Sequence, residues 1–144
     1  MKKKYFLAIL VLVTAMFLVG CGGKKEVDYS RVEAASNKQI ERISWGILKD
    51  TKAEIGEVYV VKSNDFDNVY FCATRLSGPG ISDDCVGVWA ISGDKESPGM
   101  TISVNGIAKQ FSDYPDGSKT QANIKMSDDG ADLAEKYILN KTSI

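Results

Sequence analysis

Few groups in this chain can act as nucleophiles or bases. The sequence of 144 residues contains three cysteines, Cys21, Cys72 and Cys85, and no histidine. Histidine is the commonest general base and a frequent metal ligand, so its absence excludes the usual serine triad and most metal sites. The 19 Asp and Glu residues support a narrower chemistry, such as glycoside cleavage by a carboxylate pair. The three thiols are therefore the first reactive groups to place.

Cys21 follows a segment with the features of an export signal. Residues 2–4 are lysines, and residues 5–19 carry no charge. In such signals the lysines stay on the cytoplasmic side while the apolar segment enters the membrane. The uncharged run is shorter than the roughly 20 residues of a lasting transmembrane helix, and it ends at the small Gly20. Residues 1–20 are therefore predicted to be a signal peptide.

The segment Leu18-Val19-Gly20-Cys21 resembles the lipobox of bacterial lipoproteins. This resemblance implies transfer of diacylglycerol to the Cys21 sulfur, cleavage between Gly20 and Cys21, and acylation of the new amino terminus, for example with palmitate. Two or three acyl chains anchor a protein durably in a membrane. The expected location is the extracytoplasmic face of the cell membrane or the outer membrane. The alternative is an uncleaved signal anchor with an incidental cysteine.

Cys72 and Cys85 are predicted to form a disulfide, because export places them in a compartment where disulfides persist. The bridge would close a loop of about a dozen residues and stabilise the fold by roughly 3 kcal/mol. Two reduced thiols are the alternative. The pair lacks the Cys-x-x-Cys spacing of thiol oxidoreductases, and soft ligands are too few for a closed zinc site. The sequence therefore predicts neither a metal nor a cofactor.

The remaining sequence lacks the usual catalytic motifs. It has no Gly-x-Ser-x-Gly elbow, no Walker lysine and no dinucleotide fingerprint. Asp83 and Asp84 are adjacent, and in an extended chain they would point in opposite directions, which argues against a carboxylate pair that shares a proton. The protein is predicted to be non-catalytic, with a carboxylate-based hydrolase as the weaker alternative.

A helix is predicted after a short tether. Residues 21–29 are polar and glycine-containing, as in a flexible tether. Ser30 and Glu33 have the spacing of a capping box, and apolar residues recur every three or four positions after them. The pattern predicts a helix from Ser30 to Gly46, with Trp45 packed against a sheet.

Alternating β-branched and aromatic residues predict a sheet in the middle of the chain. Asn105-Gly106 is the favoured dipeptide of a type I′ hairpin turn, although a short helical turn after it is the alternative. Trp89 is expected in the core, because both faces of its strand are apolar. The predicted strands cover residues 58–61, 69–74, 86–91, 100–104, 107–111 and 121–126.

A second helix is predicted at the end of the chain. Ser127 is a favourable N-cap, and the two aspartates after it complement the dipole of the first turn. Helix, antiparallel strands and helix together indicate an α+β fold, with a sheet of about four to six strands and both helices packed on one face. Residues 30–144 are predicted to form a single domain.

The composition favours a binding module. Removal of three lysines with the signal peptide changes the formal charge from −1 to −4, which argues against nucleic acid and against electrostatic attraction to anionic lipid. We expect a lipid-anchored module that binds a partner of the cell envelope. The alternative is an inhibitor or exclusion protein that acts on an exogenous factor, such as a lytic enzyme, a phage or a plasmid. Recognition is expected in two loops, at Gly78, Pro79, Asp83 and Asp84 and at Asp113 and Asp116.

Overall fold

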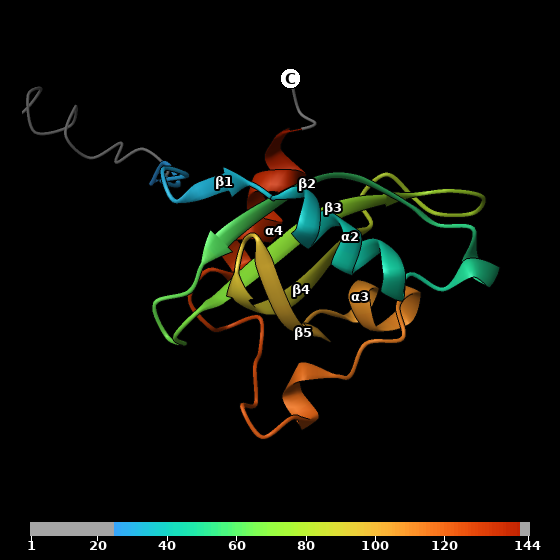
Figure 1. The fold of residues 1–144 in the computed structure, drawn as a ribbon. Helices are drawn as coiled ribbons and strands as arrows, with labels where there is room; N and C mark the ends of the chain where they lie inside the picture. The colour runs from blue at the N-terminus through green and yellow to red at the C-terminus, as the bar shows by residue number, and fades with distance from the viewer. Residues whose placement is uncertain (1–24, 142–144) are drawn as a thin grey trace, which may run out of the picture.

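The computed structural model describes residues 25–141, which form one antiparallel sheet with helices on both of its faces (Figure 1). The predicted signal peptide and the predicted lipidation site Cys21 lie outside the described residues. Each strand pairs with the next one along the chain, in the order β1-β2-β3-β4-β5. The α+β class and the five-stranded sheet confirm the prediction. The strands are β1 (Val32–Ala34), β2 (Glu54–Lys62), β3 (Val69–Ser77), β4 (Val86–Asp94) and β5 (Ser97–Ser103).

Three α-helices and two short 3-10 helices accompany the sheet in the described part of the chain. Helix α2 (Asn37–Gly46) lies between β1 and β2, and α3 (Gly106–Phe111) and α4 (Ala131–Lys141) follow β5. The 3-10 helices are η1 (Lys49–Thr51) and η2 (Gly117–Lys119). Between residues 25 and 141, every helix is too short or too polar to cross a bilayer.

The two faces of the sheet bury separate hydrophobic cores. On one face Phe71, Val88 and neighbouring side chains pack against Ala134 and Ile138 of α4. On the other face Trp89, which is fully buried, lies in one cluster with Ile43 of α2 and Ala108 of α3. Alternate residues of a strand point to opposite faces, so a central strand with two apolar faces requires a cover on each side.

This arrangement corrects the expected layering. The N-terminal and C-terminal helices were predicted to share one face, but α2 and α4 lie on opposite faces of the sheet. Periodicity shows that a helix has an apolar stripe, yet it does not state which face of the sheet that stripe covers. Both faces of β4 are apolar, so each face must be packed against a helix. Helix α2, near the N-terminus, packs on one face, and α4, near the C-terminus, packs on the other.

The first helix begins later than predicted, at a second serine. Ser36 is the N-cap: its Oγ accepts a hydrogen bond from the Gln39 N–H (3.2 Å), and the Gln39 Oε1 accepts one from the Ser36 N–H (3.1 Å). The residues after Ser30 instead form β1, which pairs with β2. Both serines have capping-box spacing, and strand pairing decides between them. The predicted end at Gly46 is confirmed.

Asn105 and Gly106 do not form the predicted hairpin turn. Asn105 is the N-cap of α3, and its Oδ1 accepts hydrogen bonds from the N–H groups of Ala108 (2.9 Å) and Val88 (3.1 Å). Its Nδ2 donates to the Val86 carbonyl (2.8 Å). The returning strand over 107–111 is therefore replaced by the helical alternative.

The last predicted strand is also absent, since residues 121–126 form turns and irregular structure. Helix α4 begins at Ala131 rather than after Ser127. Gly130, just before it, has a φ of +101°, and a Cβ there would lie 3.1 Å from Val61 and 3.2 Å from Phe71. The close approach to the sheet and the left-handed backbone at Gly130 set the start of the helix.

Candidate ligand-binding site

The structure places the two predicted recognition loops at different parts of the molecule. Residues 78–84 connect β3 to β4 at the right end of the sheet in Figure 1, whereas residues 113–119 run below β5 towards η2. Gly78, Pro79 and Asp83 are exposed. The Asp84 carboxylate accepts a hydrogen bond from the Ser82 Oγ (2.6 Å), which lowers its pKa. These contacts give the first loop a local, structural role.

The aspartates of the second loop also have structural contacts. Asp116 caps η2 through the Ser118 N–H (3.0 Å) and forms an ion pair with Lys109 (2.9 Å). The hydrogen bond from Lys109, followed by those from Ser118, lowers the Asp116 pKa to about 2. The Asp113 N–H donates to the Gly46 carbonyl (3.0 Å). A general acid needs a raised pKa, so Asp116 is unsuited to that role.

The predicted disulfide is not present, and both cysteines are free. Cys72 is fully buried in β3 opposite Trp89, whereas the Cys85 carbonyl accepts a hydrogen bond from the N–H of Leu76. Positions 72 and 76 of one strand are roughly 13 Å apart, and a disulfide requires Cα atoms within about 7 Å. The strand register therefore prevents the bridge. Burial raises the pKa of the Cys72 thiol well above its ordinary value, which makes it a poor nucleophile.

A large hollow lies under the β5 end of the sheet. It has a volume of about 650 Å³ and is bounded on the sheet side by Val69, Ala90, Met100 and Ile102. The other wall is formed by residues 120–124, called the strap below. Ligand-binding pockets typically have volumes of roughly 300–1,000 Å³, so the hollow is large enough for a small molecule.

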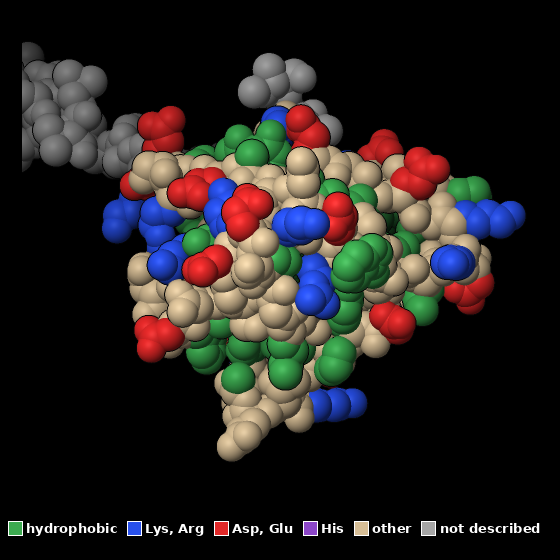
Figure 2. All heavy atoms as spheres, in the orientation of Figure 1, with side chains coloured by type: hydrophobic (Ala, Val, Ile, Leu, Met, Phe, Trp, Pro, Cys, Tyr) green, Lys and Arg blue, Asp and Glu red, His purple; other side chains and the backbone are tan. Residues whose placement is uncertain are grey.

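The hollow exists because α4 does not cover the whole face. Helix α4 contacts β1, β2, β3 and β4, and the strap lies over the remaining part of the face beside β5. Figure 2 shows a band of hydrophobic side chains above the lowest part of the molecule, where η2 and the strap are found. An extended segment fills less space than a helix, so apolar surface stays uncovered between it and the sheet.

The strap is held at its base by η2. The Ile124 N–H donates to the Gly117 carbonyl (3.0 Å), and the Thr120 Oγ1 donates to the same oxygen (2.7 Å). Gly117 itself approaches the chain closely, since a Cβ there would lie 2.9 Å from the Ile124 carbonyl oxygen. These contacts fix both ends of the strap and leave its middle, at Gln121 and Ala122, exposed.

The lining of the hollow is apolar with a small polar rim. Met100 is 71% exposed at its edge, and none of the side chains that line it is charged. The Ser92 Oγ is already engaged, because it accepts the Met100 N–H (2.9 Å). Gln121 and Thr120 supply the remaining polar atoms. The hollow can therefore hold an apolar group, but its lining offers no acid or base for catalysis.

Sequence reasoning missed this hollow. Residues 100–104 and 121–126 were both predicted as strands, which would have closed the space between them. One signal was available in the sequence. Ala90 and Ile102 are apolar positions of neighbouring strands that face the same side of the sheet, and that side must be packed against another segment. Nothing in the sequence pattern indicated that the cover would be an irregular segment.

Trp45 was predicted to pack against the sheet, and this prediction is wrong. Trp45 is 69% exposed on α2, with the Arg42 guanidinium 5.5 Å from its ring centre. It borders a second hollow of about 480 Å³, formed with Ile47, Leu48 and Ala53. Trp and Arg are enriched among the residues that contribute most to protein–protein binding, although this hollow is smaller than the first and its lining includes the charged Lys49.

Within residues 25–141, no cluster of three or more potential ligand side chains is placed to hold a metal ion. No protein-family model, curated protein or solved structure matches this chain. The function is therefore inferred from the residues and their geometry.

Proposed function

We propose that the protein is a lipid-anchored, non-catalytic binding module of the bacterial cell envelope, and that its ligand places an uncharged apolar group in the hollow between β5 and the strap. The observation that carries the binding site is the hollow itself, with a volume of about 650 Å³ and an uncharged lining. Transfer of apolar surface from water into such a site contributes about 0.8 kcal/mol for each buried CH₂ group.

The described carboxyl groups support a non-catalytic role. Where their pKa departs from the ordinary value it is lowered, at Asp28, Glu57, Asp84, Asp116 and Asp129. In each case a hydrogen bond from a neighbouring group is the main cause. These carboxylates are ionised at neutral pH and act as hydrogen-bond acceptors within the fold.

The binding site is tested with an uncharged fluorescent probe, phenylnaphthylamine. We expect the wild-type protein to bind it and Ala122→Glu to bind it about tenfold more weakly, because the new side chain narrows the exposed mouth of the hollow and its carboxylate would lose hydration against a bound apolar probe. Ala34→Glu, at an exposed position of β1, is the matched control and should bind like the wild type. Equal binding by all three proteins would show that the probe sits elsewhere.

The anchor is tested by metabolic labelling with alkyne palmitate. The native protein should take up the label and sediment with membranes, whereas Cys21→Ser should take up none and remain unprocessed. If the native protein is unlabelled and Cys21→Ser has the same processing and location, the anchoring part of the proposal is wrong.

A further inference from the structure

Three tyrosines form a continuous cluster on one flank of α4. The ring centres of Tyr29 and Tyr137 are 5.4 Å apart, and those of Tyr59 and Tyr137 are 4.7 Å apart. Lys141 completes the cluster, with its Nζ 4.3 Å from the Tyr59 ring centre. All three tyrosines are only partly buried. The cluster joins the incoming chain to β2 and to the end of α4.

The cluster also lies where the anchored chain enters the fold. Tyr29 is the first partly buried residue of the described chain, and it is eight residues after Cys21. Eight extended residues span at most about 28 Å, and a flexible chain of that length spans on average about 16 Å. If Cys21 carries lipid, the Tyr29 flank is held within this distance of the bilayer.

We propose that this flank, made by Tyr29, Tyr59 and Tyr137, rests on the lipid surface to which the protein is anchored. The proposal depends on the lipid anchor of the proposed function. Tyrosine favours the membrane interface, because its ring prefers an apolar surrounding and its hydroxyl group remains hydrated. Val27, two residues before Tyr29 in the sequence, is 41% exposed and adds apolar surface to the incoming segment.

The charges of the flank indicate an apolar rather than an electrostatic contact. The Lys141 Nζ lies 2.5 Å from the Glu57 carboxylate, so the positive charge beside Tyr59 is balanced locally. Contact through aromatic rings should therefore persist at high salt, where surface electrostatics are screened.

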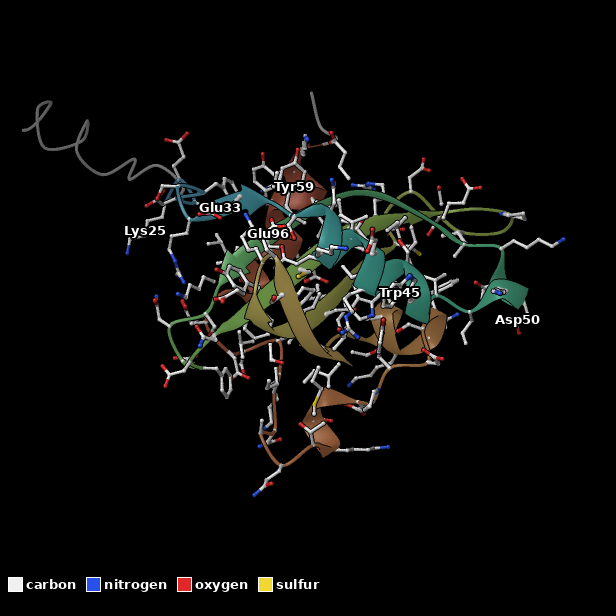
Figure 3. The ribbon with its side chains drawn as sticks, in the orientation of Figure 1. Lys25, Glu33, Trp45, Asp50, Tyr59 and Glu96 are labelled. Atoms are coloured by element: carbon white, nitrogen blue, oxygen red, sulfur yellow. The ribbon has the colours of Figure 1, made fainter. Side chains whose placement is uncertain are left out.

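This contact would orient the rest of the molecule. Figure 3 places Tyr59 at the top of the view and Trp45 and Asp50 towards its right end. Figure 1 places the C-terminal end of α4 at the top and η2, beside the strap, at the bottom. With the tyrosine flank on lipid, the hollow is directed away from the bilayer and the exposed Trp45 lies to one side of the flank, so a ligand can reach both.

The orientation is tested with the full-length lipidated protein on phosphatidylcholine vesicles that contain doxyl-labelled lipid, a short-range quencher. In the wild type Trp45 is the exposed indole and Trp89 is fully buried, so little quenching is expected. Tyr137→Trp in a Trp45→Phe background moves the reporter into the cluster, and its emission should be strongly quenched at both low and high salt. Tyr59→Trp in the same background is a second reporter that does not change α4.

The outcomes separate the two proposals. If the protein fails to float with vesicles, the lipid anchor is wrong and the orientation fails with it. If it floats but neither cluster reporter is quenched, or if Trp45 is quenched equally, the anchor stands and the docking of this flank is wrong. Quenching of the cluster reporters alone supports the proposal.

Discussion

Asp129 joins three segments that are distant in sequence. Its carboxylate accepts two hydrogen bonds from the Arg31 guanidinium (2.6 and 2.9 Å) and one from the Asn64 N–H (2.9 Å). Its own N–H donates to the Asp65 carboxylate (2.7 Å). These bonds connect the start of β1, the β2–β3 turn and the segment before α4. A single side chain thereby fixes how the chain enters its final helix.

Asp129→Asn should lower the free energy of unfolding by about 1 kcal/mol at pH 7, since it removes a partly exposed ion pair. The Arg31 hydrogen bonds, followed by the Asn64 N–H, lower the Asp129 pKa to about 2. A lowered pKa stabilises the fold above the unfolded-state value, and this stabilisation is lost as the pH falls from about 4 to 2. Denaturant unfolding should therefore show the difference between the two proteins shrinking over that range.

Asp132→Asn is the matched control for this series. Asp132 is exposed and pairs with Lys136 of the same helix (2.6 Å), so its loss should be smaller. A constant difference between Asp129→Asn and the wild type down to pH 2 would contradict the assigned role.

The two serines with capping-box spacing, Ser30 and Ser36, allow a test of which residue caps α2. Ser36→Ala removes the N-cap of α2 and should cost about 1 kcal/mol. Ser30→Ala should have a smaller effect, because Ser30 is exposed and precedes a strand, and its contacts are with the exposed Asp28 two residues earlier. Thermal unfolding of both variants measures the difference, and the reverse order would place the cap at Ser30.

Some helices and strands could be predicted from local sequence, whereas others depend on tertiary contacts. The strands around Val60, Phe71 and Trp89 and the stop at Gly46 could be predicted, because alternation and a helix breaker are local features. The chain after β5 could not, since Asn105 is equally suited to a hairpin turn and a helix cap. Its hydrogen bonds to Val86 and Val88 decide between them, and these depend on the finished sheet.

Gly106 distinguishes the two conformations experimentally. In a type I′ turn it would need a positive φ, and Gly106→Ala would destabilise the protein. In α3 it is the first helical residue, and a methyl group added to its Cα would point into open space. Gly106→Ala should therefore be neutral or stabilise the protein by up to about 1 kcal/mol. Clear destabilisation in thermal unfolding would favour the hairpin.

Asn105→Ala is the companion variant and should cost about 2 kcal/mol or more. It removes a cap and leaves the N–H groups of Val88 and Ala108 without their side-chain acceptor. Wild-type stability in this variant would contradict the role given to Asn105.

The register of β3 predicts that the cysteines remain reduced. Thiol titration of denatured protein should find both Cys72 and Cys85 free, even after purification without reductant. Cys85→Ser should unfold at the same temperature as the wild type, with or without reductant, because no bridge is lost. A loss of stability only under oxidising conditions would indicate that a disulfide forms.

At the scale of the whole molecule, both faces of the sheet are packed against other segments, but one face is covered less completely than the other. Helices α2 and α3 cover the face of Trp89, whereas the opposite face is shared by α4 and the strap. The unequal cover leaves the hollow on the α4 side. Composition and motifs pointed to a small binding module, but the position of its site depends on how the chain between η2 and α4 crosses the sheet. That path has no periodicity from which it could be predicted.

The most direct measurement of the binding site is a methyl NMR titration of the full-length protein with dodecanol. We expect shifts in the methyl groups of Ile102, Ala122 and Ile124, with those of Leu48 and Ala53 beside Trp45 unchanged. Shifts confined to Leu48 and Ala53, or no shifts at all, would contradict the assignment of the hollow between β5 and the strap as the ligand-binding site.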